Sequence, residues 1–244
     1  MINKKIRLVE LFAGVGTQAM ALRDLCKANG VNPDDVFETY KVIEFDKYPV
    51  KSYNAIHGTN ITPTDITEIH GEDIDIKEPD KYITIWTYSF PCQDLSVAGR
   101  GAGMDKGSGT RSGLLWEVER LLGEVENLPD ILIMENVTQV HGKKNLDNFN
   151  KWCEFLESKG YHNYWEDLNA KDYCIPQNRN RTFMVSTLQD VDFVFPRPVE
   201  LRLVMKDMLD DTVPEKYYIN TEKADQLIQE LADNGKLDEL KEGL

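Results

Sequence analysis

Hydrophobic positions along most of the chain fall into short strand-like runs that are separated by stretches with helical spacing. The runs are rich in β-branched and aromatic residues, which is typical of strands buried in a sheet. They cover residues 6–12, 38–43, 82–88, 130–134, about 161–168 and 182–188. Apolar residues recur at helical spacing most clearly in residues 110–126 and 146–158. Strands that alternate with helices predict an α/β fold with a mostly parallel, twisted sheet and helices on both faces.

A cysteine follows one of these predicted strands. The run 82–88 leads into Pro91, which cannot donate to a strand ladder, and then into Cys92. Ligands of open α/β sheets bind at the carboxyl ends of the strands, so Cys92 stands where a site is expected. An isolated cysteine is more often an inert buried thiol than a nucleophile, and its position alone leaves both interpretations open.

Two features near the start of the chain are typical of nucleotide-type ligands. Gly14, Gly16 and Ala19 follow the first predicted strand with the G-x-G-x-x-A spacing, which allows a tight turn and close approach of the backbone to a ligand. Glu44 ends the second predicted strand, where an acid can hold a pair of ribose hydroxyls, although the usual offset of about 20 residues is exceeded. Alone, the glycine spacing is a weak signal, since glycines after a strand often form only a turn, and Glu44 would more often be a solvated strand end.

Residues 97–110, which follow Cys92, contain five glycines. This composition favours a mobile lid over a packed turn.

Composition narrows the class of protein. The 244 residues contain no apolar run near the roughly 20 residues of a membrane span, and no signal peptide is expected, so we predict a cytoplasmic protein. Four scattered cysteines show no disulfide or zinc spacing, and no metal site is predicted. The net charge of −14 repels phosphate and argues against a nucleic acid partner, unless most of the acids form a solubilising surface.

Motifs in a fixed order carry a family resemblance. The main ones are Phe12-Ala13-Gly14-Val15-Gly16, Pro91-Cys92-Gln93, Glu135-Asn136-Val137 and Gln177-x-Arg179-x-Arg181. Supporting matches lie at residues 44–48, 65–67 and 111–115. Over residues 5–190 the chain resembles the bacterial and phage cytosine-5 DNA methyltransferases. The resemblance implies a Rossmann-like S-adenosylmethionine-dependent methyltransferase fold and a DNA (cytosine-5-)-methyltransferase, an activity found in restriction-modification systems.

By resemblance, four residues carry the chemistry. Cys92 would add to carbon-6 of a cytosine flipped out of duplex DNA, so that carbon-5 can accept a methyl group. Glu135 would protonate or hydrogen-bond the ring nitrogen N3 and hold the exocyclic amine. Arg181 and Arg179 would hold the base and favour the thiolate.

The resemblance also assigns binding residues. The implied cofactor is S-adenosylmethionine, with S-adenosylhomocysteine as its product and with no metal. Its expected binding residues are Phe12, Ala13, Gly14, Gly16, Glu44, Phe45, Asp65, Ile66, Pro91 and Leu115. The expected DNA-binding residues are Gln93, Ser96, Arg100, Lys106 and Arg111. Ala98 stands where the family often has a serine, so filling the vacated base stack would fall to Ser96 or Gln93.

The end of the chain departs from the family pattern. Residues 1–195 are expected to form the S-adenosylmethionine-binding catalytic domain, and 196–244 an acidic connector with a helix from Thr221 to about Leu231. Neither the target-recognition region nor the late motifs are found. We therefore expect a second polypeptide or a missing C-terminal segment that carries target recognition. The alternative is a catalytically incompetent S-adenosylmethionine-binding relic or subunit of a split methyltransferase. An RNA substrate is a minor variant.

Overall fold

The computed structural model describes residues 4–75, 77–95 and 103–236. They divide into two compact units, one made of the residues up to 168 together with 180–196, the other of 169–179 together with the residues from 197 onward. The sequence pattern indicated a break near residue 195, but not that residues 169–179 belong with the tail.

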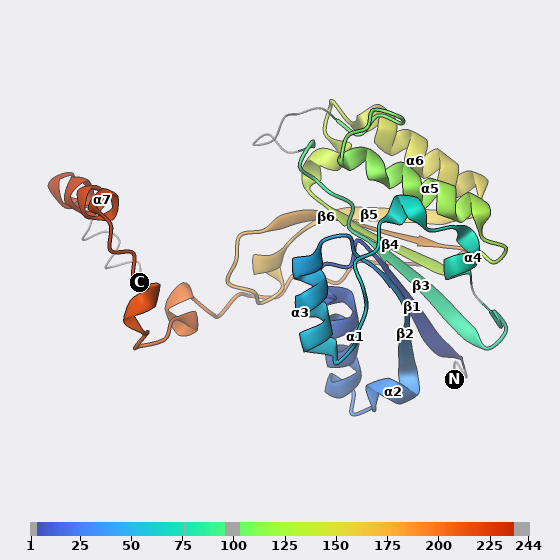
Figure 1. The fold of residues 1–244 in the computed structure, drawn as a ribbon, viewed down its shortest axis with the longest axis horizontal. Coiled ribbons are helices and arrows are strands. Elements are labelled where there is room, and N and C mark those ends of the chain that lie inside the picture. The colour runs from blue at the N-terminus through green and yellow to red at the C-terminus, as the bar shows by residue number, and fades with distance from the viewer. Residues whose placement is uncertain (1–3, 76, 96–102, 237–244) are drawn as a thin grey trace. The chain divides into compact units, whose positions relative to one another are not determined.

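A six-stranded sheet with the order β2-β1-β3-β4-β6-β5 forms the centre of the first unit (Figure 1). Its strands are β1 (Lys5–Leu11), β2 (Phe37–Ile43), β3 (Tyr82–Tyr88), β4 (Ile131–Asn136), β5 (His162–Asn169) and β6 (Asn180–Thr187). The first four strands in the order pair in parallel, whereas β6 is antiparallel to β4. The mostly parallel α/β fold predicted from the sequence is confirmed.

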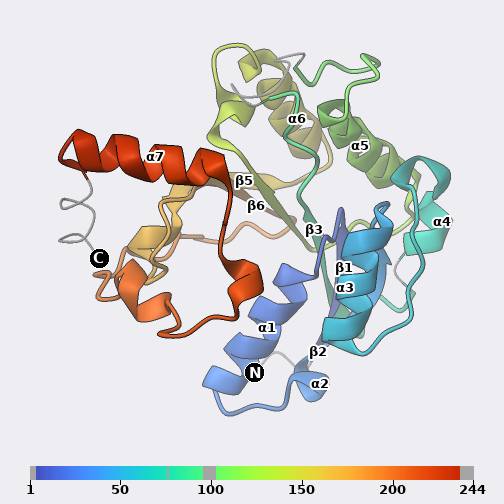
Figure 2. The same ribbon diagram turned by 60° about the vertical axis from the view of Figure 1, so that its left-hand side comes forward.

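Helices cover both faces of this sheet. Figures 1 and 2 show α5 (Leu115–Glu124) and α6 (Leu146–Ser158) on one face and α1 (Thr17–Ala28) on the other. The larger core lies beneath α5 and α6, where Trp86, Tyr88 and Trp152 are almost fully buried. The remaining helices of this unit are α2 (Pro33–Val36), α3 (Lys47–His57) and α4 (Gly71–Ile74).

The segment before α5 differs from the prediction. Apolar spacing favoured one helix from residue 110 to 126, but a 3-10 turn at Ser112–Leu114 precedes α5. The tighter turn rotates the positions that follow it relative to an α-helix that starts earlier.

The second unit contains α7 (Glu222–Asp233) and irregular segments. The Thr221 side chain accepts a hydrogen bond from the Ala224 N–H at 3.2 Å, so the predicted N-cap is confirmed. Residues 169–179 join this unit through the Val199 N–H, which donates to the Asp172 carbonyl at 2.8 Å. Within the described ranges, every helix is too short or too polar to cross a bilayer.

One buried carboxylate joins three elements of the first unit. Glu10 lies on β1 and is fully buried. It accepts hydrogen bonds from the Ala19 N–H of α1 at 3.2 Å and from the Tyr53 hydroxyl of α3 at 2.7 Å. Burial raises the pKa of Glu10 because it disfavours the charged form.

We expect Glu10→Leu to lower the free energy of unfolding by about 1–3 kcal/mol, since two buried donors lose their acceptor. The raised pKa means that the folded chain binds the Glu10 proton more tightly than the unfolded chain does. This contribution to stability therefore falls as pH rises above the ordinary value of 4.5, up to the raised pKa of the folded state. Glu10→Gln does not titrate and should show a weaker pH dependence. Urea unfolding at pH 5 and pH 8 measures both effects, and identical pH dependence in the wild type and Glu10→Gln would contradict the assignment.

Candidate active site

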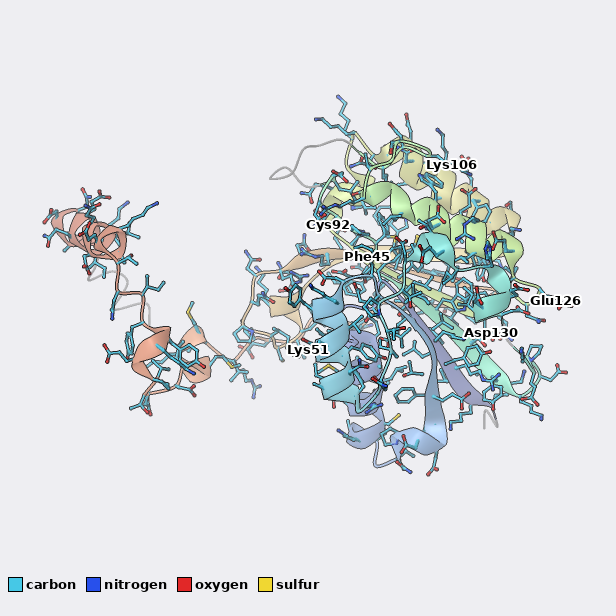
Figure 3. The ribbon with its side chains drawn as sticks, viewed as in Figure 1. Phe45, Lys51, Cys92, Lys106, Glu126 and Asp130 are labelled. Carbon is cyan, nitrogen blue, oxygen red and sulfur yellow. The ribbon has the colours of Figure 1, made fainter. Side chains whose placement is uncertain are left out.

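Cys92 lies just beyond the carboxyl end of β3. Its side chain is half-buried against the larger core, and its carbonyl accepts a hydrogen bond from the Leu95 N–H at 3.0 Å. Figure 3 shows Cys92 and Phe45 toward one end of the sheet and Asp130 toward the other. The thiol therefore stands at the sheet edge where open α/β folds bind ligands.

An ion pair lies at the end of the neighbouring strand. Glu135 is the second-last residue of β4, and its Oε1 is 3.0 Å from Nε of Arg181 on β6. The antiparallel register sets Phe183 opposite Glu135, so Arg181 is the diagonal neighbour on the same face. Both side chains are only about a quarter exposed, at 24% and 22%, which strengthens the pair relative to one at the open surface.

Asn136 connects the two strand ends. Its Nδ2 donates to the Phe90 carbonyl at 2.9 Å, and its Oδ1 accepts from the Val137 N–H at 2.9 Å. The residue is 2% exposed, so these bonds are shielded from water. The sequence placed Asn136 inside a motif but gave it no role; the amide fixes the chain two residues before Cys92 relative to Glu135.

The other cysteines have different surroundings. Cys26 is buried in the first unit, and Cys174 is exposed in the second. Burial, reinforced by Glu157 and Glu154, raises the pKa of Cys153 to about 11, which keeps it as a thiol near neutral pH.

A cavity of about 570 Å³ opens beside the strand end that carries Cys92. Six of the ten residues predicted to bind the cofactor line it, namely Phe12, Glu44, Phe45, Asp65, Ile66 and Pro91. Leu114 lines it as well, whereas the predicted Leu115 is fully buried in the core. The ring of Phe45 is 70% exposed and lines the cavity.

The Glu44 carboxylate is held by the backbone on both sides. Its two oxygens accept from the Gly14 N–H and the Asp46 N–H, each at 2.8 Å. Gly14 has a φ of +57°, and a Cβ there would meet no atom within 4 Å, so the predicted turn leaves open space above it. At Gly16, with a φ of +79°, a Cβ would lie 2.3 Å from the His57 ring, so helix packing there requires glycine. Neither Gly14, Gly16 nor the buried Ala13 lines the cavity itself.

The residues predicted to bind DNA are divided. Gln93 and Arg111 line the cavity, and the Arg111 guanidinium donates to Gln93 Oε1 at 2.7 Å. Lys106 pairs with Glu119 of α5 and lies 5.5 Å from the Trp116 ring centroid. Ser96, Ala98, Arg100 and the centre of the predicted lid lie outside the described residues.

Arg179, predicted to be catalytic, belongs to the second unit. Its N–H donates to Asn169 Oδ1 at 3.1 Å, and its carbonyl accepts from the Ala170 N–H at 2.9 Å. These bonds close the turn at residues 169–179. Among the four predicted catalytic residues, Cys92, Glu135 and Arg181 are the three that belong to the first unit.

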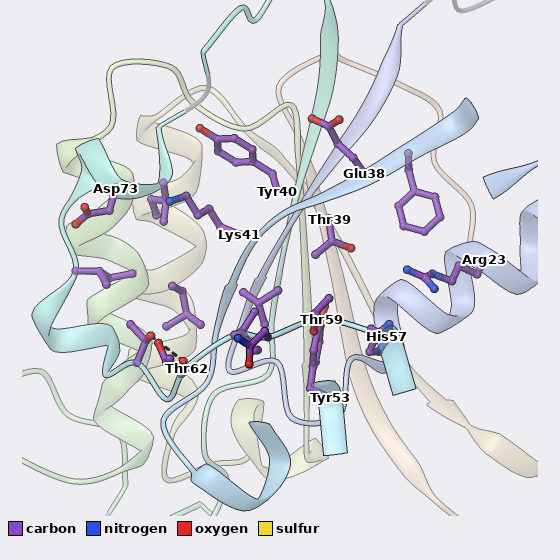
Figure 4. Close-up of a pocket in the computed structure, with 18 of the residues that line it drawn as sticks. Arg23, Glu38, Thr39, Tyr40, Lys41, Tyr53, His57, Thr59, Thr62 and Asp73 are labelled. Atoms are coloured by element: carbon purple, nitrogen blue, oxygen red, sulfur yellow. Dashed lines mark hydrogen bonds between the residues drawn. The ribbon is translucent and has the colours of Figure 1, made fainter. Parts of the chain in front are cut away.

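A larger hollow of about 980 Å³ follows the outer edge of β2 (Figure 4). Its lining mixes the cations Arg23 and Lys41 with the anions Glu38 and Asp73, so its charges do not converge on one type of ligand. None of its lining residues belongs to the segment around Cys92, whereas Pro91 and Gln93, the two chain neighbours of Cys92, line the smaller cavity. The smaller cavity beside Cys92 is therefore the candidate active site.

Comparisons with known proteins bear on the family of the chain. The profile described as C-5 cytosine-specific DNA methylase matches residues 6–241. The Type II methyltransferase M2.ScrFI of Lactococcus lactis subsp. cremoris is 49% identical over 145 residues, which are 59% of this chain and 40% of that protein. The Orphan methyltransferase M.SssI of Spiroplasma monobiae is 35% identical over 272 positions, covering 89% of this chain and 68% of that protein.

A solved structure supports the fold. The Dnmt2 methyltransferase of S. pombe superposes with a TM-score of 0.67 at 19% identity, covering 94% of this chain and 66% of that chain. The chain thus spans between 40% and 68% of the lengths of these three proteins. Because the family profile extends over residues 6–241, the resemblance inferred from the motifs is confirmed, and the chain belongs to the C-5 cytosine-specific DNA methylase family.

Proposed function

We propose that this chain is the catalytic part of a DNA (cytosine-5-)-methyltransferase, which transfers a methyl group to carbon-5 of a cytosine flipped out of duplex DNA. The observation that carries the proposal is that Cys92 follows β3 and Glu135 lies near the end of β4, two adjacent parallel strands beside a cavity. Arg181, at the start of the antiparallel strand β6, pairs with Glu135 there. A nucleophile and a carboxyl group so arranged can act on the two sides of one ring.

Cys92 starts the reaction. Its thiolate forms a bond to carbon-6, and the electron pair of the carbon-5–carbon-6 double bond moves toward carbon-5 and the ring nitrogen N3. Glu135 shares a proton with N3 and accepts a hydrogen bond from the exocyclic amine. Arg181 holds one oxygen of this carboxyl group at 3.0 Å and so fixes its orientation. Carbon-5 takes the methyl group with this electron pair, and the electrons of the broken bond stay with the methyl donor, which leaves. The proton on carbon-5 is then lost, its electron pair re-forms the carbon-5–carbon-6 double bond, Cys92 leaves as a thiolate, and the proton shared with N3 returns to Glu135.

S-adenosylmethionine would supply the methyl group, and the residues around the 570 Å³ cavity fit it. The fixed carboxylate of Glu44 suits a pair of ribose hydroxyls. The exposed Phe45 ring and Ile66 suit the faces of an adenine, with Asp65 at the exocyclic amine. The open space at Gly14 suits the methionine end.

Recognition of a DNA sequence is proposed to reside in polypeptide outside residues 1–244. Duplex binding proceeds through many cationic phosphate contacts, whereas this chain has a net charge of −14. The length of one relative supports this proposal, since an alignment of 89% of this chain covers 68% of M.SssI. A non-catalytic relic is less well supported, because Cys92 and the Glu135–Arg181 pair occur together at one edge. The proposed substrate implies the compartment that holds DNA, which in bacteria is the cytoplasm.

Cys92 should form a covalent bond to DNA that contains 5-fluorocytosine when the complete enzyme is used. Fluorine at carbon-5 cannot leave as a proton does, so the final elimination is blocked and the adduct accumulates. Denaturing electrophoresis and mass spectrometry of the trapped peptide measure the result. Cys153→Ser is the control that should trap DNA normally; trapping by Cys92→Ser would rule out the assignment.

Glu44→Ala should weaken the binding of S-adenosylmethionine by about 1.5–3 kcal/mol, since charged hydrogen bonds to the ribose are lost. Phe45→Ala should also weaken it, through lost contact with the adenine. Calorimetry measures both affinities. Glu72→Ala removes an exposed acid of α4 that does not line the cavity and should bind normally. Unchanged affinity in both cavity variants would refute the proposed pocket.

Residues 1–244 alone should methylate duplex DNA negligibly and bind S-adenosylmethionine weakly. Activity should return when a more basic recognition segment is added, either by extending the reading frame or as a separate chain. Transfer of labelled methyl groups to DNA, with and without that segment, measures this. Robust sequence-specific methylation by the 244-residue chain would show that no further polypeptide is needed.

A further inference from the structure

A buried hydroxyl holds the peptide that precedes Cys92. The Oγ of Ser112, a residue with no exposed surface, donates to the Pro91 carbonyl at 2.7 Å. The Asp94 N–H lies 3.3 Å from the same oxygen and donates to it. One side chain thus contacts the backbone on both sides of the nucleophile, and a buried hydroxyl with this geometry is costly to remove.

A carboxylate holds Ser112 in turn. Oδ2 of Asp94 accepts from the Arg111 N–H at 2.8 Å and from the Ser112 N–H at 3.3 Å. These donors stand at the start of the 3-10 turn before α5, so the Asp94 carboxylate accepts from backbone N–H groups that the turn itself leaves without a partner. The Asp94 carbonyl also accepts from the Gly103 N–H at 3.1 Å. Hydrogen bonds to a charged acceptor are stronger than neutral ones, which makes this connection firm.

The same connection reaches the candidate cofactor cavity. Pro91 and Gln93, the residues on either side of Cys92, both line the cavity. Both accept a hydrogen bond at 2.7 Å from the segment that precedes α5. The Pro91 carbonyl accepts from the Ser112 hydroxyl, and the Gln93 side chain accepts from the Arg111 guanidinium. Arg111 and Leu114 complete this wall. A ligand that displaces Pro91 or Gln93 in the cavity would therefore shift the backbone next to Cys92.

We propose that Asp94 and Ser112 are positioning residues, which fix the Cys92 thiol through its backbone and couple its exposure to occupation of the cavity. The proposal rests on the proposed function in one respect, that the cavity binds S-adenosylmethionine or its product. Neither side chain is assigned a contact with the reacting base. A purely structural role would instead lower stability and leave the reactivity of Cys92 unchanged.

The test is the rate at which iodoacetamide alkylates Cys92 in the full 244-residue chain, followed peptide by peptide with mass spectrometry. The exposed Cys174 of the second unit provides an internal reference in each sample. Ser112→Ala and Asp94→Ala should raise the Cys92 rate about fivefold, the equivalent of one lost hydrogen bond. Asp94→Asn keeps an oxygen acceptor and should restore most of the wild-type rate. S-adenosylhomocysteine should change the Cys92 rate in the wild type and much less in Ser112→Ala and Asp94→Ala.

Asp130→Ala is the matched control. Its carboxylate accepts from the Thr84 N–H at 2.8 Å, toward the opposite end of β3. This variant should lose stability in urea unfolding while its Cys92 rate stays at the wild-type value. If Ser112→Ala and Asp94→Ala behave like Asp130→Ala, the positioning role is refuted. Should Asp94→Ala fail to fold, Ser112→Ala and Asp94→Asn decide the question.

Calorimetry with S-adenosylhomocysteine separates the two proposals. If the wild type does not bind it, the cofactor assignment fails, while the alkylation rates without ligand still decide whether Asp94 and Ser112 position Cys92. If it binds and the variants retain the wild-type rates, the positioning role fails and the cofactor assignment stands.

Discussion

The part of the first unit around the turn at residues 12–16 depends on the hydrogen bonds that the buried Glu10 side chain accepts. Two donors, one from α1 and one from α3, converge on it from the face of the sheet opposite α5 and α6. The turn at residues 12–16 lies between β1 and α1, so its shape depends on where α1 begins. Its glycines can then bring a backbone N–H to Glu44. The carboxyl group of Glu10 is costly to bury, and the hydrogen bonds that it accepts join β1 to α1 and α3.

Hydrophobic pattern predicted the strands and helices whose burial is one-sided or complete. β3 and α6 have the predicted bounds, since one is a continuous buried β-branched run and the other has a clear apolar stripe. The pattern did not predict α3, because only Val50 and Tyr53 of its residues are buried. The prediction of a mostly parallel sheet did not specify the direction of β6, which is antiparallel to β4. The absence of a crossover helix between β5 and β6 is the signal that could have indicated an antiparallel strand, because parallel neighbours need such a crossover.

The site was predictable where chemistry coincides with strand ends. Cys92, Glu135 and Glu44 all follow or end parallel strands, and parallel strands end at one edge. Asp94, Ser112 and Asn136 were missed because they act through hydrogen bonds to distant backbone groups, which no spacing rule reveals. The exchange of Leu115 for Leu114 at the cavity reflects the 3-10 turn before α5. The individual roles of these residues stay predictions.

The antiparallel pairing of β4 with β6 has a consequence for synthesis on the ribosome. The chain leaves the ribosome from its N-terminus at about 5–20 residues per second, and domains generally fold as units. All residues that line the cavity lie between Phe12 and Leu114, so they are synthesised first. Glu135 emerges later, and its partner Arg181 arrives only with β6, the last strand to leave the ribosome. The ion pair between Glu135 and Arg181 can therefore form only after every residue that lines the cavity has left the ribosome.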